Sequence, residues 1–223
     1  MNRTKLRNIK AVIFDFDGTL AVLNIDFSSM RERVLDLMKQ FGVDKKSIRE
    51  KYTLELIDEV CQILLKKNDS NVDEFYRRAH LILHRIEMEA AGQGRLIPGT
   101  EETLRTLRAK RIKVGIVTRN CADAVLKVFP DIETACDVFV SRNSVKHVKP
   151  HPDHLLHVME AFQILGEEAI MIGDHTLDIQ AGKRVGMKTI GVLTGRIKRE
   201  EFEKTGADFI LENASEICGL LED

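Results

Sequence analysis

Residues 11–19 read Ala-Val-Ile-Phe-Asp-Phe-Asp-Gly-Thr. The first four are apolar, and a short uninterrupted run of this kind predicts a strand that is buried on both faces, as in a parallel sheet. Two aspartates, a glycine and a threonine follow at once. Because ligands of parallel α/β sheets bind beyond the carboxyl ends of the strands, residues 15–19 are the first place at which we expect chemistry.

The pattern becomes helical after this strand and remains so to about Ala91. Apolar residues recur at spacings of three and four, which is typical of helices that bury one face. Ser29 and Glu32 have the spacing of a capping box for the first helix, and Gly42 is a stop signal for it. The expected helices run from about 29 to 41, 47 to 67 and 73 to 91.

The residues after Pro98-Gly99 alternate between short apolar strands and helices. This alternation predicts a parallel sheet covered by helices on both faces, so we expect an α/β protein whose first strand is separated from the others by a helical insertion. The expected strands are 112–117, 138–140, 169–172, 189–192 and 209–211, and the expected helices are 100–110, 121–128, 152–165, 177–185, about 198–204 and a final one after the last strand.

Polar groups stand at the ends of several later strands, as they do after the first. The triplet Thr-Arg-Asn at 118–120 follows one strand, and Asp174 and Asp178 follow another. Lys149 lies in a loop before a helix. Since the carboxyl ends of parallel strands meet at one edge of a sheet, we expect these groups to converge there.

Charge balance predicts a metal ion at this edge. Asp15, Asp17, Asp174 and Asp178 would bring four carboxylates together, and Lys149 offsets only one of them. Such a cluster either raises its pKa values or recruits a cation. Carboxylates without histidine or cysteine partners suit a hard divalent ion, and Mg²⁺ is the natural occupant.

A magnesium site beside a lysine attracts phosphate, and the loop after the first strand supports the same interpretation. Gly18 and Thr19 precede a turn in which backbone N–H groups can approach an anion closely. The spacing Asp15-x-Asp17 also allows the two carboxylates to take different chemical roles. One carboxylate can attack phosphorus and form an aspartyl-phosphate, and the second can protonate the leaving oxygen and later deprotonate the attacking water. The residues therefore indicate phosphoryl chemistry.

These motifs, in this order, resemble those of the haloacid dehalogenase-like hydrolase superfamily, and the match covers essentially the whole chain. The shared features are Asp-x-Asp-Gly-Thr at 15–19, Thr118, Lys149 and Gly-Asp-x-x-x-Asp at 173–178. The helical block, with Leu-Ile-Pro-Gly at 96–99 after it, resembles the branch that includes phosphoglycolate phosphatases.

The resemblance implies a Rossmann-like parallel-sheet core of residues 1–20 and 97–223, with an inserted α-helical cap domain of residues 21–96. In this branch the cap is expected to close over the substrate and exclude bulk water. The residues that set specificity would lie in the cap, so the sequence does not name the substrate.

The resemblance also implies catalytic and metal-binding roles. Asp15 would be the nucleophile and Asp17 the general acid and base, while Thr118 and Lys149 would hold the transferring phosphoryl group. The expected Mg²⁺ ligands are the Asp15 carboxylate, the Asp17 backbone carbonyl and Asp174, with Asp178 as a ligand or beside one.

Four further residues are expected to bind substrate, namely Gly18, Thr19, Arg119 and Asn120. Arg119 stands where this branch often has asparagine. His175 likewise stands where the branch often has serine. Both flank the expected site, so these departures concern substrate preference and not the type of reaction.

The implied function is that of a Mg²⁺-dependent phosphatase, which acts on a small phosphorylated metabolite such as a phosphoglycolate-like phosphomonoester through a phospho-aspartate. A sugar phosphomutase of the β-phosphoglucomutase type shares the Asp-x-Asp pair and stays open. So does a non-catalytic phospho-acceptor or ligand-binding relative. Dehalogenases and phosphonate hydrolases of the superfamily lack the second aspartate, so the presence of Asp17 disfavours both.

Composition argues against several other classes. The 34 lysines and arginines balance 35 acidic residues to a net charge of -1, whereas a dedicated nucleic-acid-binding protein would be strongly basic. No apolar run approaches the roughly 18 residues of a membrane span, and no signal-peptide pattern is present. The 4 cysteines are widely spaced, which favours buried free thiols and a cytoplasmic location. The oligomeric state stays open between monomer and homodimer.

Three histidines recur at steps of three, at His151, His154 and His157. This spacing spreads the rings around a helix instead of gathering them. No second cluster of ligands accompanies them. We therefore expect histidines on the flank of a helix and not a zinc site.

Overall fold

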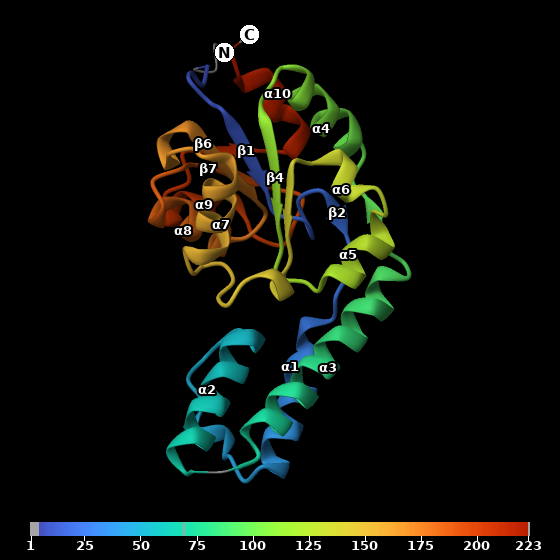
Figure 1. Ribbon diagram of the computed structural model, residues 1–223, viewed down its shortest axis with the longest axis vertical. Helices are drawn as coiled ribbons and strands as arrows, with labels where there is room; N and C mark the ends of the chain where they lie inside the picture. The colour runs from blue at the N-terminus through green and yellow to red at the C-terminus, as the bar shows by residue number, and fades with distance from the viewer. Residues whose placement is uncertain (1–4, 69, 223) are drawn as a thin grey trace. The chain divides into compact units, whose positions relative to one another are not determined.

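The computed structural model of the protein describes residues 5–68 and 70–222, which form two compact units (Figure 1). The larger unit consists of the residues up to Leu23 and from Gln93 onward, and the smaller unit is Asn24–Gly92. The smaller unit is a few residues shorter at each end than the helical insertion expected from the sequence.

Six parallel strands form the sheet of the larger unit, in the order β5-β4-β1-β6-β7-β8. β1 (Ala11–Phe14) lies between β4 (Lys113–Val117) and β6 (Ala169–Gly173), and all of its residues are buried. Strand order runs outward in opposite directions from β1, and parallel sheets bind ligands at such a reversal. The outer strands are β5 (Val138–Val140), β7 (Lys188–Val192) and β8 (Phe209–Leu211).

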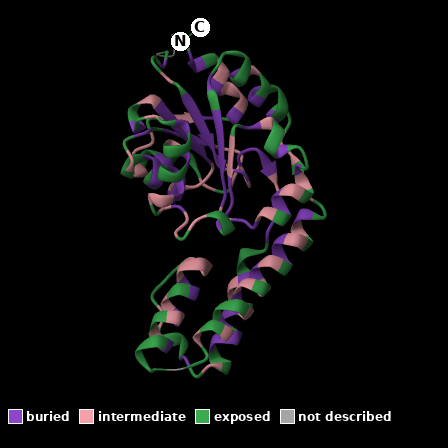
Figure 2. Cartoon of the chain, in the orientation of Figure 1, coloured by how far each residue is buried: buried purple, intermediate pink, exposed green. Residues whose placement is uncertain are grey.

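Helices cover both faces of this sheet, which confirms the expected α/β architecture. α7 (Asp153–Phe162) and α8 (Thr176–Arg184) pack on the face that carries Ile13 and Met171. Figure 2 shows the strands as a buried layer, with exposed residues on the outer sides of the helices. The remaining helices of the unit are α4 (Thr100–Ala109), α5 (Ala122–Val128), α6 (Ile132–Ala135), α9 (Arg199–Thr205) and α10 (Ile217–Leu220).

A small antiparallel sheet joins the chain where it leaves the larger unit to where it returns. β2 (Ala21–Val22) pairs with β3 (Arg95–Leu96), with Ala21 opposite Leu96. Two-residue strands are too short for an alternating pattern to show in the sequence, so neither was expected. This pairing belongs to the larger unit, whereas the sequence placed both strands inside the helical insertion.

The smaller unit is built from α1 (Phe27–Gln40), α2 (Thr53–Lys66) and α3 (Val72–Ala91), which pack against one another through buried apolar side chains. The rings of Phe41 and Phe75 meet edge to face at 5.4 Å between centroids. In the described part of the chain, no helix combines the length and the apolar character that crossing a membrane requires.

Two local expectations for the smaller unit are wrong. The cap of α1 is Asp26, whose side chain accepts the Ser29 N–H at 2.9 Å, and Ser29 lies inside the helix instead of capping it. The helix expected from residue 47 begins only at Thr53. The N–H groups of Arg49 and Glu50 donate instead to the Glu59 carboxylate, which holds this segment outside the helix.

All four cysteines are free, as expected from their spacing. Cys121 and Cys136 are buried, while Cys61 and Cys218 are only half-buried. Burial raises the pKa of the Cys136 thiol to about 12, so this thiol stays protonated.

Candidate active site

Strand order brings the predicted polar residues to one edge of the sheet. Asp15 follows β1, and its N–H donates to the Ile172 carbonyl of the neighbouring β6 at 2.8 Å. Thr118 follows β4 on the other side of β1. Asp174 follows β6, and Asp178 lies in the first turn of α8. Residues more than 100 positions apart in sequence are therefore neighbours because their strands are adjacent.

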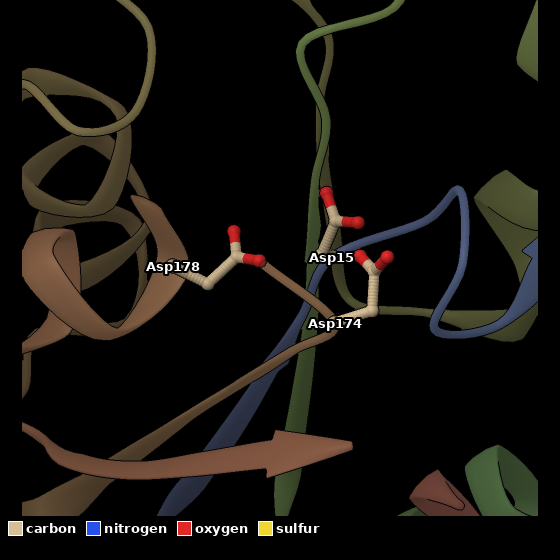
Figure 3. Close-up of side chains that lie close together, drawn as sticks. All are labelled: Asp15, Asp174 and Asp178. Carbon is tan, nitrogen blue, oxygen red and sulfur yellow. The ribbon is translucent and has the colours of Figure 1, made fainter. Parts of the chain in front are cut away.

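Three carboxylates meet at this edge. Asp15, Asp174 and Asp178 each offer an oxygen within 4.8 Å of the others, and Figure 3 shows Asp15 and Asp174 side by side with Asp178 reaching toward them. Two glycines border Asp174. A Cβ on Gly18 would lie 2.2 Å from its Oδ2, and a Cβ on Gly195 would lie 1.9 Å from the same atom. Side chains at these two positions would collide with the carboxylate.

Lys149 is buried between two of these acids. Its Nζ lies 2.6 Å from Asp15 Oδ1 and 2.7 Å from Asp178 Oδ1, and it also donates to the Val117 carbonyl at 3.2 Å. Only 1% of the residue is exposed. Asp178 makes a second contact. Its Oδ2 accepts the His175 N–H at 3.1 Å and so caps α8. Asp178 therefore contacts both the start of α8 and the buried ammonium of Lys149.

The electrostatics of the cluster follow from burial. Desolvation raises the pKa of Asp15 to about 7, against the opposing effect of the Lys149 charge. Burial also raises the pKa of Asp174, and the neighbouring carboxylates add to this shift. Burial alone would lower the pKa of Lys149, but Asp15 and Asp178 outweigh that effect and raise it. One fixed cation thus faces three acids, and a further positive charge would favour their ionised forms.

The donor set fits a hard divalent cation. Asp15, Asp174 and Asp178 offer carboxylate oxygens alone, which is the chemistry that Mg²⁺ prefers. Among the described residues, no other group of histidines, cysteines or acids comes close enough to hold a metal ion. The histidines at 151, 154 and 157 are not part of this group.

Asp17 lies beside this cluster, and its charge adds to the raised pKa values of Asp15 and Asp174. Its Oδ1 accepts the Leu23 N–H at 2.9 Å, and its carboxylate is not among the three that meet. Three of the four expected carboxylates therefore come within 4.8 Å of one another, and the fourth, that of Asp17, acts on Asp15 and Asp174 through its charge. The chain turns after Phe16, whose carbonyl accepts the N–H groups of Leu20 and Ala21 at 2.9 Å each.

The loop formed by Gly18 and Thr19 uses its own amides internally. Gly18 has a φ of 88° and donates its N–H to the Ala21 carbonyl at 2.7 Å, while the Thr19 N–H donates to Phe16 at 3.3 Å. The sequence suggested instead that these amides face an anion. Thr19 is fully buried, and its Oγ1 has no hydrogen-bond partner in the part of the chain that the structure describes.

The triplet after β4 links two parts of the site. The buried Thr118 Oγ1 accepts the Asn120 N–H at 3.2 Å. The Arg119 guanidinium donates to the backbone carbonyl of Lys149. Asn120 is buried, and its Nδ2 has no hydrogen-bond partner among the described residues. Thr118 and Asn120 therefore present buried polar groups beside β4, while Arg119 holds the Lys149 peptide.

Sequence reasoning missed three residues that touch this region. Gly195 borders Asp174, as described above. Arg142 is buried and donates to the Arg119 carbonyl at 2.8 Å. His154, expected on a helix flank, is fully buried and contacts the Lys149 backbone. Gly195 and Arg142 belong to no sequence motif and His154 belongs only to the run of histidines at steps of three, so only the fold shows what these residues contact.

The family assignment rests on similarity across nearly the whole chain. Residues 12–192 match the family model described as haloacid dehalogenase-like hydrolase. The chain belongs to this family. The haloacid dehalogenase-like hydrolases include a domain-containing protein from Arabidopsis thaliana that is 31% identical over 226 residues, covering 99% of this chain and 85% of the relative.

Two further similarities agree with this assignment. A protein named pyrophosphatase PpaX from Bacillus cereus is 30% identical over 221 residues, covering 96% of this chain and 97% of its own. The crystal structure of a hydrolase from Pseudomonas syringae superposes with a TM-score of 0.69 at 24% identity, covering 92% of this chain and 94% of that one. The protein is thus a haloacid dehalogenase-like hydrolase with the fold of its family.

Proposed function

We propose that this haloacid dehalogenase-like hydrolase is a Mg²⁺-dependent phosphatase that hydrolyses a small phosphorylated metabolite through a phospho-aspartate on Asp15. The observation that carries the proposal is the position of Lys149, with its ammonium 2.6 Å from the Asp15 carboxylate and the carboxylates of Asp174 and Asp178 alongside. An ionised carboxylate held next to fixed positive charge is what a nucleophile for phosphorus requires.

The reaction has two balanced steps. A carboxylate oxygen of Asp15 attacks phosphorus, and the bond from phosphorus to the leaving oxygen breaks as Asp17 donates a proton to that oxygen. Water then attacks the phosphorus of the aspartyl-phosphate while Asp17 takes its proton, which releases phosphate and restores Asp15. Thr118 and Lys149 hold the oxygens of the transferring group in both steps.

Asp15, Asp174 and Asp178 would hold Mg²⁺ through carboxylate oxygens, together with the backbone carbonyl of Asp17. When bound, the ion supplies positive charge that offsets the acids and polarises the phosphoryl group. Gly18 and Gly195 leave the Asp174 carboxylate the room that this role needs.

Substrate recognition is proposed at two places. Gly18, Thr19, Arg119 and Asn120 would lie next to the phosphoryl group, and the unpartnered Oγ1 of Thr19 and Nδ2 of Asn120 are the polar groups that support this role. The smaller unit, Asn24–Gly92, serves as the cap domain that selects the leaving group. The relative named pyrophosphatase makes pyrophosphate a candidate substrate alongside small phosphomonoesters of the phosphoglycolate kind.

The proposal is tested by phosphate release from a panel that contains pyrophosphate, phosphoglycolate, sugar phosphates, nucleotides and p-nitrophenyl phosphate, with Mg²⁺ and with a chelator. We expect release that requires Mg²⁺. Transfer of the phosphoryl group to a sugar, dependent on a bisphosphate primer and with little free phosphate, would instead establish the phosphomutase alternative. No reaction on any compound would contradict the proposed phosphatase, and a phospho-aspartate that persists for minutes would favour a phospho-acceptor.

A further inference from the structure

His154 is the second residue of α7, and its side chain is fully buried. Each of its ring nitrogens meets a backbone atom. Nδ1 lies 3.3 Å from the Lys149 nitrogen, and Nε2 lies 3.1 Å from the Val140 carbonyl oxygen. The ring therefore spans the gap between the end of β5 and the loop that carries Lys149.

These contacts determine the tautomer of the ring. The backbone nitrogen of Lys149 can only donate, so Nδ1 of His154 must accept. The ring proton is then on Nε2 and donates to Val140. Burial, with the Lys149 charge adding to it, lowers the pKa of His154 to about 3, so the neutral ring keeps both bonds at any ordinary pH.

The ring connects the backbone next to Thr118 with the loop that carries Lys149, and the proposed reaction uses both of these residues. The Val140 carbonyl that accepts from His154 also accepts the N–H of Thr118 at 3.0 Å. On the other side, the backbone of Lys149 is held at both of its polar groups. Its N–H donates to His154, and its carbonyl accepts from Arg119. From this peptide the lysine side chain reaches Asp15.

We propose that His154 is a positioning residue, which holds the Lys149 backbone against the end of β5 so that the ammonium meets the nucleophilic carboxylate. The inference rests on the proposed phosphatase reaction. It assigns the histidine no proton transfer and no contact with substrate. A misplacement of Lys149 by about 1 Å is enough to slow a reaction on the order of 10²-fold.

The first experiment compares variants that differ in these two bonds. His154→Phe removes both, whereas His154→Asn keeps an acceptor near the place of Nδ1. Val158→Ala is the matched control, because Val158 is equally buried in α7 and contacts the sheet instead of the Lys149 loop. For each variant we would measure kcat and KM for p-nitrophenyl phosphate with Mg²⁺, and the free energy of unfolding in urea.

We expect His154→Phe to lower kcat about 10²-fold, His154→Asn to recover a large part of this loss, and Val158→Ala to lose stability but keep kcat within about twofold. A His154→Phe enzyme with the kcat of Val158→Ala would overturn the inference. If His154→Phe does not fold, the comparison of His154→Asn with Val158→Ala carries the test, with Asn expected to retain most of the wild-type kcat. A kcat for His154→Asn about 10²-fold below that of Val158→Ala would then overturn the role of the Nδ1 bond.

A second measurement does not depend on turnover, so it separates failure of this inference from failure of the proposed function. Nitrogen-15 spectra of the wild-type ring should show the Nε2–H tautomer unchanged from pH 8 to pH 5. The Lys149 amide should exchange with solvent slowly in the wild type, and at least about tenfold faster in His154→Phe, which loses the bond, than in Val158→Ala. A ring that titrates near pH 6.5, or a Lys149 amide that exchanges rapidly in the wild type, would contradict the bridge even in an active enzyme.

Discussion

The ammonium nitrogen of Lys149 lies 2.6 Å from Oδ1 of Asp15, although the two residues are 134 positions apart in the chain. Both are buried, and the same ammonium contacts Asp178 at 2.7 Å. This pairing favours the charged form of the proposed nucleophile, against the larger effect of burial, which raises its pKa to about 7. The catalytic proposal and the stability of this edge of the sheet therefore depend on the same contact.

Replacing Lys149 by methionine should destabilise the protein as well as inactivate it. The change leaves the carboxylates of Asp15 and Asp178 buried without their cation, and removing one partner of a buried ion pair costs about 3 to 5 kcal/mol. Urea unfolding would measure this loss. Lys146→Met removes an exposed lysine from the same loop and should stay within about 0.5 kcal/mol of the wild type. Equal stability of both variants would refute the structural role of the pair.

Asp17→Asn should affect substrates according to their leaving groups. Without a proton donor, release of a poor leaving group such as an alkoxide should slow by about 10² to 10⁴-fold. The effect should be much smaller for p-nitrophenolate, which leaves without a proton. The two rates are measured as release of the leaving group in the first turnover at saturating Mg²⁺, because the later water step also uses Asp17 and is common to both substrates. A uniform loss on both substrates would show that Asp17 is not the general acid.

Gly195→Ala should weaken metal binding without unfolding the chain. The new methyl group would be placed 1.9 Å from Asp174 Oδ2, so the carboxylate must move. We expect the Mg²⁺ concentration for half-maximal rate to rise about tenfold or more, since supporting contacts of this kind tune metal affinity by such factors. Gly219→Ala is the control, because a Cβ there meets no atom within 4 Å. An unchanged Mg²⁺ requirement in Gly195→Ala would remove Asp174 from the proposed metal site.

His154 should make the protein less stable in acid. Its pKa is lowered from a usual value of 6.5 to about 3 in the folded chain, so between these values the unfolded state binds more protons. The contribution of His154 to the free energy of unfolding is therefore fully present above about pH 6.5 and is lost as the pH falls toward 3. At pH 5 the loss is about 2 kcal/mol.

The measurement is urea unfolding at pH 8 and pH 5. His154→Phe lacks the titrating ring, so its loss between these two pH values should be about 2 kcal/mol smaller than that of the wild type. Identical pH dependence in the two proteins would mean that the ring is not held neutral.

Much of the site could be predicted because its residues directly follow apolar strands. Asp15 and Thr118 each come immediately after a run of buried residues, so their place at the edge of the sheet followed from the pattern alone. The strand at Ala11–Phe14 was predicted with its observed bounds for the same reason. The helical insertion was also visible, because a helix that buries one face repeats its apolar residues over several turns.

What could not be predicted depends on backbone partners that are remote in sequence. The ring of His154 bonds to the peptides of Lys149 and Val140, and neither bond leaves a trace in side-chain spacing. Gly195 matters only because Asp174 lies against it. The bond that the Asp17 carboxylate accepts from the Leu23 N–H likewise cannot be read from the Asp-x-Asp spacing.

The central claim, that Asp15 attacks phosphorus, is tested most directly by phosphate release from Asp15→Asn on the best substrate of the panel with saturating Mg²⁺. The amide has nearly the same shape but is a poor nucleophile, so the account predicts a loss of at least about 10³-fold in kcat with little change in fold. Asp36→Asn, which alters an exposed aspartate of α1, should keep the wild-type rate. An Asp15→Asn enzyme that releases phosphate at a rate near that of the wild type would contradict the phospho-aspartate mechanism.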